Sequence, residues 1–537
     1  MIDPSSTVDG DVARSTPVDD VDKGVNVLGT TCKIVLGVAT AALSVAALTG
    51  CTSGAQSATG DHTTLTLAVS GRPPSLDPAL QSSAGDLVWR WHAVYDTLLR
   101  CDQNGKVHPA AAKSFSMSDD AKTLTMKLRD GMEFSDGKPV DAAAVKASIE
   151  HMQTGGGSDA GRVAGMQITT PDSDTVALTA KQPTGQLPTF MCFAPGIVAS
   201  PSQLDSEDVG SKVVSSGPYT LVPSKTTSGS VYTFQKRDDY WDAKSYPYEN
   251  LVLKVMPDVN ARLNALRSKE IQGAVIDQST AAQASSSGLE VLSHLSGWSG
   301  LAIADRAGET VPALGDVRVR QAMNMVFDRK AIAKGLFNGE ATPTTQIFTP
   351  NETAYQAKLD DQYPYDVKKA KQLMQEAGYA DGFTLQIPNQ ASDDGSGNKV
   401  NPMVVQQLAL LKIKVDQVTI SGPTAQDKVL RGDFPVFPIQ LGTADSLFDI
   451  VQSLQPDSIW NVRHTSDPEL QPLLDKAQTL QGSAADENAQ AINEYVVDQA
   501  WYAPWVDVKS YFALTSKDLA PKQTDQFHLI PNLWDFR

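Results

Sequence analysis

The pattern of apolar residues predicts a strand, a loop and a helix in the segment before residue 100. Residues 64–69 alternate polar and apolar positions, which predicts a strand. Residues 72–78 contain three prolines, which lack the N–H groups that a strand ladder needs, so a loop is expected there. Apolar positions in 86–99 recur three and four residues apart and predict an amphipathic helix.

Similar patterns predict further elements downstream. Strand-like runs occupy 114–118 and 123–128, and helical spacing is found in 141–152, 317–327 and 366–378. Each of these helices follows an aspartate that suits an N-cap: Asp141, Asp316 and Asp366.

An uncharged run of fifteen residues follows Lys33 and ends at Leu48-Thr49-Gly50-Cys51. A membrane core needs about 20 helical residues, so this run is short for a transmembrane helix and suits a signal peptide. Its last four residues resemble the lipobox of bacterial lipoproteins, in which the cysteine receives lipid such as palmitate. We therefore expect 1–50 to be a signal peptide and Cys51 to be lipidated; the alternative is an uncleaved signal anchor.

The segment before this run is acidic. Residues 1–22 hold six aspartates and a single cation, Arg14, whereas signal peptides begin with a basic region. We expect the true start to lie downstream, near Val25 or Val27. Residues 51–61 are small and polar without periodicity, which predicts a flexible tether after the lipidated cysteine.

Length and charge narrow the classes of protein. The chain has 537 residues, enough for roughly three domains. Its formal charge is −17, which would repel a polyphosphate backbone, and we find no basic patch. We therefore expect no nucleic-acid partner.

Cys101 and Cys192 are the cysteines that remain outside the predicted signal peptide and lipidation site. They could form one disulfide or remain two buried thiols. No Cys-x-x-Cys occurs, and no two histidines lie four residues apart, so nothing local indicates a zinc site. We expect no metal and no cofactor.

Seven sequence blocks in a fixed order carry a family resemblance. They are LTLAVSGRPPSLDPAL (65–80), YDTLLRCDQNGKVHPAAAKSF (95–115), TLTMKLRDGMEFSDGKPVDAAAVKASIEHM (123–152), SSGPYTLV (215–222), YTFQKRDDYWD (232–242), DVRVRQAMNMVFDRKAIAKGLFNGEATP (316–343) and YPYDVKKAKQLMQEAGY (363–379). Together they resemble family 5 extracytoplasmic solute-binding proteins, the peptide, dipeptide and nickel binders of bacterial ABC importers. The resemblance covers nearly all of 62–537.

The resemblance implies an α/β fold of the type II periplasmic-binding-protein class, with two lobes, an extra subdomain and a ligand cleft between the lobes. Mapped onto this chain, lobe I is 62–92, 207–297 and 503–537, the subdomain is 93–206, and lobe II is 298–502. The hinge would lie where the chain crosses between lobes, near 298–304 and 499–505.

The resemblance also implies where a ligand binds. In peptide-binding members, a segment at the place of 440–445 pairs its backbone with an extended ligand, and an aspartate at its end receives the α-ammonium. In this chain the resemblance implies that the backbone of Gly442, Thr443 and Ala444 pairs with the ligand. Asp445 would receive the ligand's α-ammonium. The alternative is that Asp445 is a surface turn residue or the N-cap of 446–454.

Further candidates for ligand contact are Trp298 and Ser82. Trp89 or Trp91 could also line the cleft, although tryptophans of this kind are more often core residues. The sequence departs from the family pattern at Leu441-Gly442 and Asp449-Ile450, and Lys399 is the one cation in 388–402. Without a clear partner for a dipeptide carboxylate, longer peptides or another solute become more favoured.

These features predict a substrate-binding lipoprotein that captures an oligopeptide or dipeptide and delivers it to an ABC permease and ATPase. We expect a monomer, lipid-anchored at the extracytoplasmic face of the cell membrane. The alternatives are another solute, such as a nickel chelate, sugar or opine-like compound, and a sensory role. The sequence contains no nucleophile elbow, zinc-protease or phosphate-loop motif, so we expect no enzyme activity.

Overall fold

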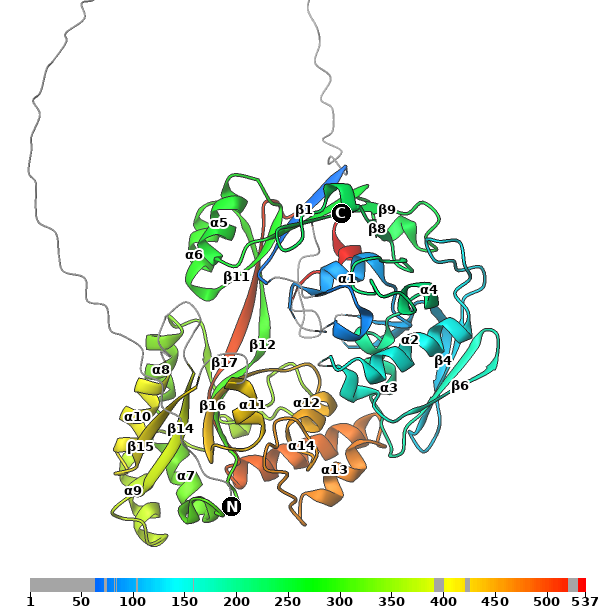
Figure 1. The fold of residues 1–537 in the computed structure, drawn as a ribbon. Helices are drawn as coiled ribbons and strands as arrows, with labels where there is room; N and C mark the ends of the chain where they lie inside the picture. The colour runs from blue at the N-terminus through cyan, green and yellow to red at the C-terminus, as the bar shows by residue number, and fades with distance from the viewer. Residues whose placement is uncertain are drawn as a thin grey trace, which may run out of the picture. The chain divides into compact units, whose positions relative to one another are not determined.

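The computed structural model describes residues 63–537 apart from 72–74, 82, 84, 103–104, 158, 391–399, 421–424 and 520–529. The described residues belong to a compact unit that spans Gly60–Arg537 (Figure 1). The predicted signal peptide, Cys51 and the predicted tether lie outside the described residues. Within the described ranges, no helix is long and apolar enough to cross a membrane.

A nine-stranded mixed sheet runs through this unit. In spatial order its strands are β16 (Val436–Gly442), β12 (Glu290–Ile303), β17 (Tyr502–Leu514), β11 (Gly273–Ile276), β1 (Thr64–Val69), β10 (Asn250–Val255), β9 (Val231–Lys236) and β8 (Tyr219–Leu221), and β13 (Thr342–Pro343) also pairs with β17. β1 has the bounds predicted from the sequence, and it pairs in parallel with β10 and β11. The sheet therefore brings together segments from both ends of the described chain.

Strands β12 and β17 lie side by side over most of their length (Figure 1). Near one end of β12, Leu292 belongs to a core that also contains residues of β1, β9 and β10. Near its other end, Leu301 and Ile303 belong to a second core. The strand pair thus joins two separately packed regions close to the predicted crossings at 298–304 and 499–505; the lobe boundaries and the hinge remain predictions.

Helices and a small parallel sheet surround the second core. They are α7 (Val317–Met325), α8 (Arg329–Leu336), α9 (Val367–Glu376), α10 (Asn401–Ala409), β14 (Thr384–Gln390) and β15 (Lys414–Ile420). A third core contains α12 (Ser446–Ser453), α13 (Gln471–Ala477) and α14 (Ser483–Asp498). Apart from the two α-helices that precede residue 155, the remaining α-helices of the described chain are α3 (Leu187–Phe190), α4 (Pro201–Leu204), α5 (Val259–Arg267), α6 (Gln278–Ser286) and α11 (Ala425–Leu430). Asp316 and Asp366 cap α7 and α9, as predicted.

A four-stranded antiparallel sheet lies within the predicted subdomain. Its order is β4 (Ala112–Met117), β5 (Thr123–Leu128), β7 (Thr175–Thr179) and β6 (Gln167–Asp172), and α2 (Ala142–Thr154) packs on it. Asp141 caps α2 by accepting the N–H of Ala144 at 2.8 Å. These elements confirm the strands and the helix predicted here, and they share one core with β1 and β10.

The helix predicted over 86–99 is wrong in its extent. α1 covers only Val88–Val94, and Tyr95 is extended. The Tyr95 hydroxyl donates to the Leu76 carbonyl at 2.6 Å, and the next N–H, of Asp96, donates to Ser216 Oγ at 2.9 Å. These long-range contacts, which the periodicity does not show, take the backbone out of the helix, and the chain continues into β2 (Leu99–Cys101), which pairs with β3 (Val107–Pro109).

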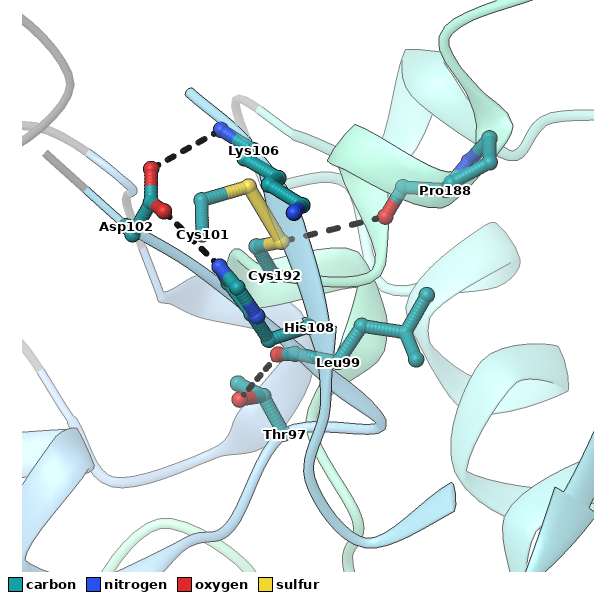
Figure 2. The surroundings of a disulfide bond; sticks show 8 residues. All are labelled: Thr97, Leu99, Cys101, Asp102, Lys106, His108, Pro188 and Cys192. Atoms are coloured by element: carbon teal, nitrogen blue, oxygen red, sulfur yellow. Dashed lines mark hydrogen bonds and ion pairs between the residues drawn. A yellow bond between two sulfur atoms is a disulfide. The ribbon is translucent and has the colours of Figure 1, made fainter. Parts of the chain in front are cut away.

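A disulfide joins Cys101 on β2 to Cys192, two residues after α3 (Figure 2). The Cα atoms are 5.6 Å apart and the two residues are separated by 91 positions in the chain. Of the two alternatives that the sequence leaves open, the structure shows the disulfide. A cross-link over this many residues stabilises mainly by restricting the unfolded chain, and here both ends lie within the predicted subdomain.

Candidate ligand-binding site

Asp445 stands between an edge strand and a helix. β16 occupies one edge of the nine-stranded sheet and ends at Gly442, which is exposed. α12 begins directly after Asp445, and Asp445 Oδ1 accepts the N–H of Phe448 at 2.9 Å. The structure therefore confirms the N-cap interpretation of Asp445. A role of the same carboxylate in ligand binding remains a prediction.

Two main-chain groups of the predicted strand-addition segment already have partners. The Thr443 N–H donates to the Ser296 carbonyl at 3.1 Å, and the Gly442 carbonyl accepts from Gln452 Nε2 at 3.1 Å. Ala444 packs against the core that contains β1. Pairing of a ligand with 442–444 would therefore use the other main-chain groups of this segment.

Three carboxyl groups gather at the start of α12. Asp449 follows Asp445 by one helical turn, and it shares a hydrogen bond with Glu352. The Glu352 side chain is positioned by Thr349, whose N–H and Oγ1 donate to Glu352 Oε1 at 2.7 and 2.9 Å. A loop and a helix far apart in sequence thus place their carboxyl groups together.

Burial dominates the electrostatics of this group. It raises the pKa of Asp445, Asp449 and Glu352, and the negative charge of Glu352 raises the pKa of Asp449 further. A hydrogen bond between two carboxyl groups requires a proton on one of them, and we place it on Asp449. None of the three forms an ion pair with a lysine, arginine or histidine of the described chain. The described residues therefore supply no cationic partner for these carboxyl groups.

A fourth carboxyl group comes from β17. Asp507 is paired with Trp298 across the β12–β17 ladder, is 2% exposed, and has no hydrogen-bond partner at Oδ1. Burial, with the negative charges of Asp360 and Glu352, raises the pKa of Asp507 to about 8. The described residues include no cluster of His, Cys, Asp or Glu that could hold a metal ion.

The tryptophan candidates occupy core positions. Trp298 is 1% exposed and packs edge-on against Tyr502, with the ring centroids 5.4 Å apart. Trp89 and Trp91 are also buried, and Trp89 Nε1 donates to the Pro531 carbonyl at 2.7 Å. Ligand contact by Trp298 remains a prediction, and Ser82 lies outside the described residues.

A cavity of about 880 Å³ lies beside α12. One wall comes from 161–190, within the predicted subdomain, and the other from 448–478. Gln452 lines the cavity, and its Nε2 also donates to the Gly442 carbonyl and to Asp449 Oδ1. This side chain connects the cavity to the candidate site, and the volume falls within the range of about 300 to 1,000 Å³ that small-ligand sites have.

Direct contacts hold the two walls of the cavity together. The Arg162 guanidinium lies 5.5 Å from the ring centroid of Phe190 on its own side and 5.3 Å from that of Phe448 on α12. The Gly185 N–H donates to Gln478 Oε1 at 3.3 Å. A cation placed between two aromatic faces is attracted to both, so Arg162 links the two walls of the cavity.

Sequence reasoning identified Asp445 but missed Asp449, Glu352 and Asp507. Two aspartates four residues apart at the start of a predicted helix were an available signal, because that spacing places both on one helix face. Glu352 and Asp507 come from a loop and a strand elsewhere in the chain, so only the fold brings them to α12.

Comparison with known proteins decides the family. The family model "Bacterial extracellular solute-binding proteins, family 5 Middle" matches residues 106–454. The chain belongs to this family. Among family relatives, the glutathione-binding protein GsiB of Salmonella paratyphi A is 30% identical over 332 residues, which are 60% of this chain and 62% of that protein. The chain thus aligns with less than two thirds of that relative's length.

Two solved structures show the fold of this solute-binding protein. AgaA from A. tumefaciens R10, in complex with agropinic acid, superposes with a TM-score of 0.73 at 23% identity, over 88% of this chain and 98% of AgaA. DppA from Helicobacter pylori, in complex with the peptide STSA, superposes with a TM-score of 0.71 at 20% identity, over 87% of this chain and 98% of DppA. These matches confirm the α/β, type II periplasmic-binding-protein fold.

Proposed function

We propose that this solute-binding protein captures peptides outside the cell by their free amino terminus and delivers them to an ABC permease and its ATPase. The observation that carries the proposal is the group of buried carboxyl groups at Asp445, Asp449 and Glu352, which forms no ion pair within the described chain. A peptide α-ammonium would supply the missing cation. The glutathione named for GsiB and the peptide bound to DppA support the choice of ligand class.

In this proposal the protein acts as a monomer that lipid on Cys51 holds at the outer face of the cell membrane. The support is the sequence LTGC at 48–51 after an apolar run. The Cys51→Ala variant should leave the detergent phase in a partition assay or remain unprocessed. Unchanged lipid labelling of that variant would contradict the anchor.

The peptide assignment is tested by removing the charge on each side of the proposed contact. Trialanine and N-acetyl-trialanine are titrated by calorimetry into the wild type and into Asp445→Asn. A charge-assisted hydrogen bond contributes about 1.5 to 3 kcal/mol, so each change alone should weaken binding by roughly 10- to 150-fold. The two changes together should cost less than their sum, because they remove the same contact.

Asp366→Asn is the matched control. Asp366 caps α9 through the Lys369 N–H at 2.8 Å, as Asp445 caps α12, and asparagine caps helices about as well as aspartate. This control should bind trialanine like the wild type. If the wild type binds free and acetylated trialanine equally, the peptide assignment is rejected. The favoured ligand would then be a nickel chelate, a sugar or an opine-like solute. Among solved structures, AgaA is in complex with agropinic acid.

A further inference from the structure

A crevice of about 280 Å³ lies between α6 and α8, against β17. One wall is the start of α6, with Gln278, and the other is the turn that follows α8, with Phe337 and Glu340. Residues 508–511 of β17 form its floor. The crevice is separate from the cavity beside α12, because the two share no lining residue.

The crevice lies where two separately packed regions join. Ala284 of α6 and Tyr511 of β17 belong to a fourth core, whereas Phe512, the next residue of β17, belongs to the first core, that of β1, β9 and β10. Successive residues of a strand point to opposite faces, so the first and fourth cores cover the two faces of one region. In the same way, Val436 and Phe437 of β16 belong to the second and third cores, which cover the two faces of the other region.

The crevice and the cavity beside α12 lie on opposite sides of this joint. The crevice separates α6, in the fourth core, from α8, in the second. The cavity separates 161–190, which shares the first core, from 448–478, which shares the third. In Figure 1, α6 and α8 lie to the left of β12 and β17, and α12 lies to their right. A rotation of the two regions about these strands must therefore widen one space as it narrows the other.

The side chain of Gln278 spans the crevice. Its Nε2 donates to the Phe337 carbonyl, and among the described residues this is the one hydrogen bond between the two walls. The same carbonyl accepts the Glu340 N–H at 2.8 Å, so the turn after α8 has its own closing bond without Gln278. Because Gln278 already touches the opposite wall, its side chain limits how far the two walls can approach.

We propose that Gln278 is a spacer that limits the opening of the cavity beside α12 from the far side of the joint. Opening the cavity brings the walls of the crevice together, and the Gln278 side chain meets the turn at Phe337 and stops the movement. The length of the side chain at position 278 therefore sets the balance between open and closed forms. This inference goes beyond the proposed function, because it holds for any ligand that the two regions enclose.

The experiment compares the wild type with Gln278→Ala and Gln278→Trp by X-ray scattering of the free proteins and by calorimetry with trialanine. The shorter side chain should allow wider opening and give a larger radius of gyration, and the longer one should give a smaller radius. Apparent affinity scales with the fraction of free protein that is already in the binding-competent form. Gln278→Ala should therefore weaken trialanine binding by about 2- to 10-fold, and Gln278→Trp should strengthen it by a similar factor.

Gln283→Ala and Gln283→Trp are the matched controls, because Gln283 lies on the same helix, is exposed and does not line the crevice. Both should keep the radius and the affinity of the wild type. Equal radii for the wild type and Gln278→Ala would overturn the spacer, as would a smaller radius for Gln278→Ala, so this variant decides the outcome even if Gln278→Trp fails to fold. If the wild type does not bind trialanine but the free proteins keep the expected order of radii, the proposed function fails and the spacer stands.

Discussion

Asp96 and Asp507 are both buried aspartates, yet their surroundings are opposite. Asp96, between α1 and β2, is 3% exposed and accepts hydrogen bonds from Tyr240 Oη at 3.0 Å and Trp241 Nε1 at 2.5 Å, with Arg100 at 3.6 Å. Asp507, on β17, is 2% exposed, has no partner at Oδ1 and lies near other carboxyl groups. Burial raises the pKa of both, but only Asp96 receives compensation from the protein.

The contrast separates a buried carboxyl group that the protein compensates with donors from one that it does not. A complete set of donors around a carboxylate stabilises one packing arrangement. A carboxylate without donors lowers stability and is retained where the missing partner comes from outside. By this criterion the network at Asp96 is part of the scaffold, whereas we propose that Asp507 belongs to the candidate site.

The largest effect is expected at the compensated site. Asp96→Ala removes the shared partner of Arg100, Tyr240 and Trp241, so we expect a loss of about 3 to 5 kcal/mol in the free energy of unfolding. The measurement is urea unfolding. Asp381→Ala serves as the control, because its exposed ion pair with Lys412 at 3.1 Å should contribute less than about 1 kcal/mol. Equal effects of the two substitutions would break the comparison.

Substitution of Asp507 should change the free energy of unfolding in the opposite direction. Because the folded-state pKa is about 8 and the ordinary value is 3.8, the folded protein retains a proton that the unfolded chain releases between these values. Stability should therefore fall as pH rises from about 4 to 8. Asp507→Asn removes this dependence and should raise the free energy of unfolding at pH 7 by about 1 to 3 kcal/mol. Destabilisation at pH 7 would mean that an unrecognised cation compensates Asp507.

The two regions also differ in what the sequence could predict. Local pattern sufficed for β1, for the strands and helix of the subdomain, and for the aspartate caps at Asp141 and Asp366, since these depend on neighbours in sequence. It failed for α1, because contacts of Tyr95 and Asp96 with distant residues end the helix. Of the carboxyl residues near α12, local pattern identified Asp445 alone. Glu352 and Asp507 reach α12 only through tertiary packing.

A smaller, pH-dependent effect is expected in ligand binding. An ammonium pairs with ionised carboxylates, and burial has raised the pKa of Asp445, Asp449 and Glu352. As pH falls through these raised pKa values, the groups take up protons that an ammonium must displace, so trialanine affinity should fall, by at most about tenfold per pH unit for each displaced proton. Calorimetry at pH 7 and pH 5 measures the drop, and Asp445→Asn should reduce it. An unchanged affinity at pH 5 would show that the free site is already ionised there.

The smallest effect on peptide affinity is expected from a substitution that holds the two walls of the cavity beside α12 apart. A Cβ on Gly185 would lie 2.6 Å from the Gln478 carbonyl oxygen on the opposite wall, so Gly185→Ala should hold the two walls apart. The walls can relieve this clash by separating, and the cost should therefore stay near the lower end of overpacking, about 1 kcal/mol, or roughly fivefold in tetraalanine affinity. Gly335→Ala is the control, because a Cβ there meets no atom within 4 Å. X-ray scattering with tetraalanine should give a larger radius of gyration for Gly185→Ala than for this control. Identical radii and affinities would mean that closure of the cavity contributes nothing to binding, and the contrast between paired and unpaired polar groups would then concern stability alone.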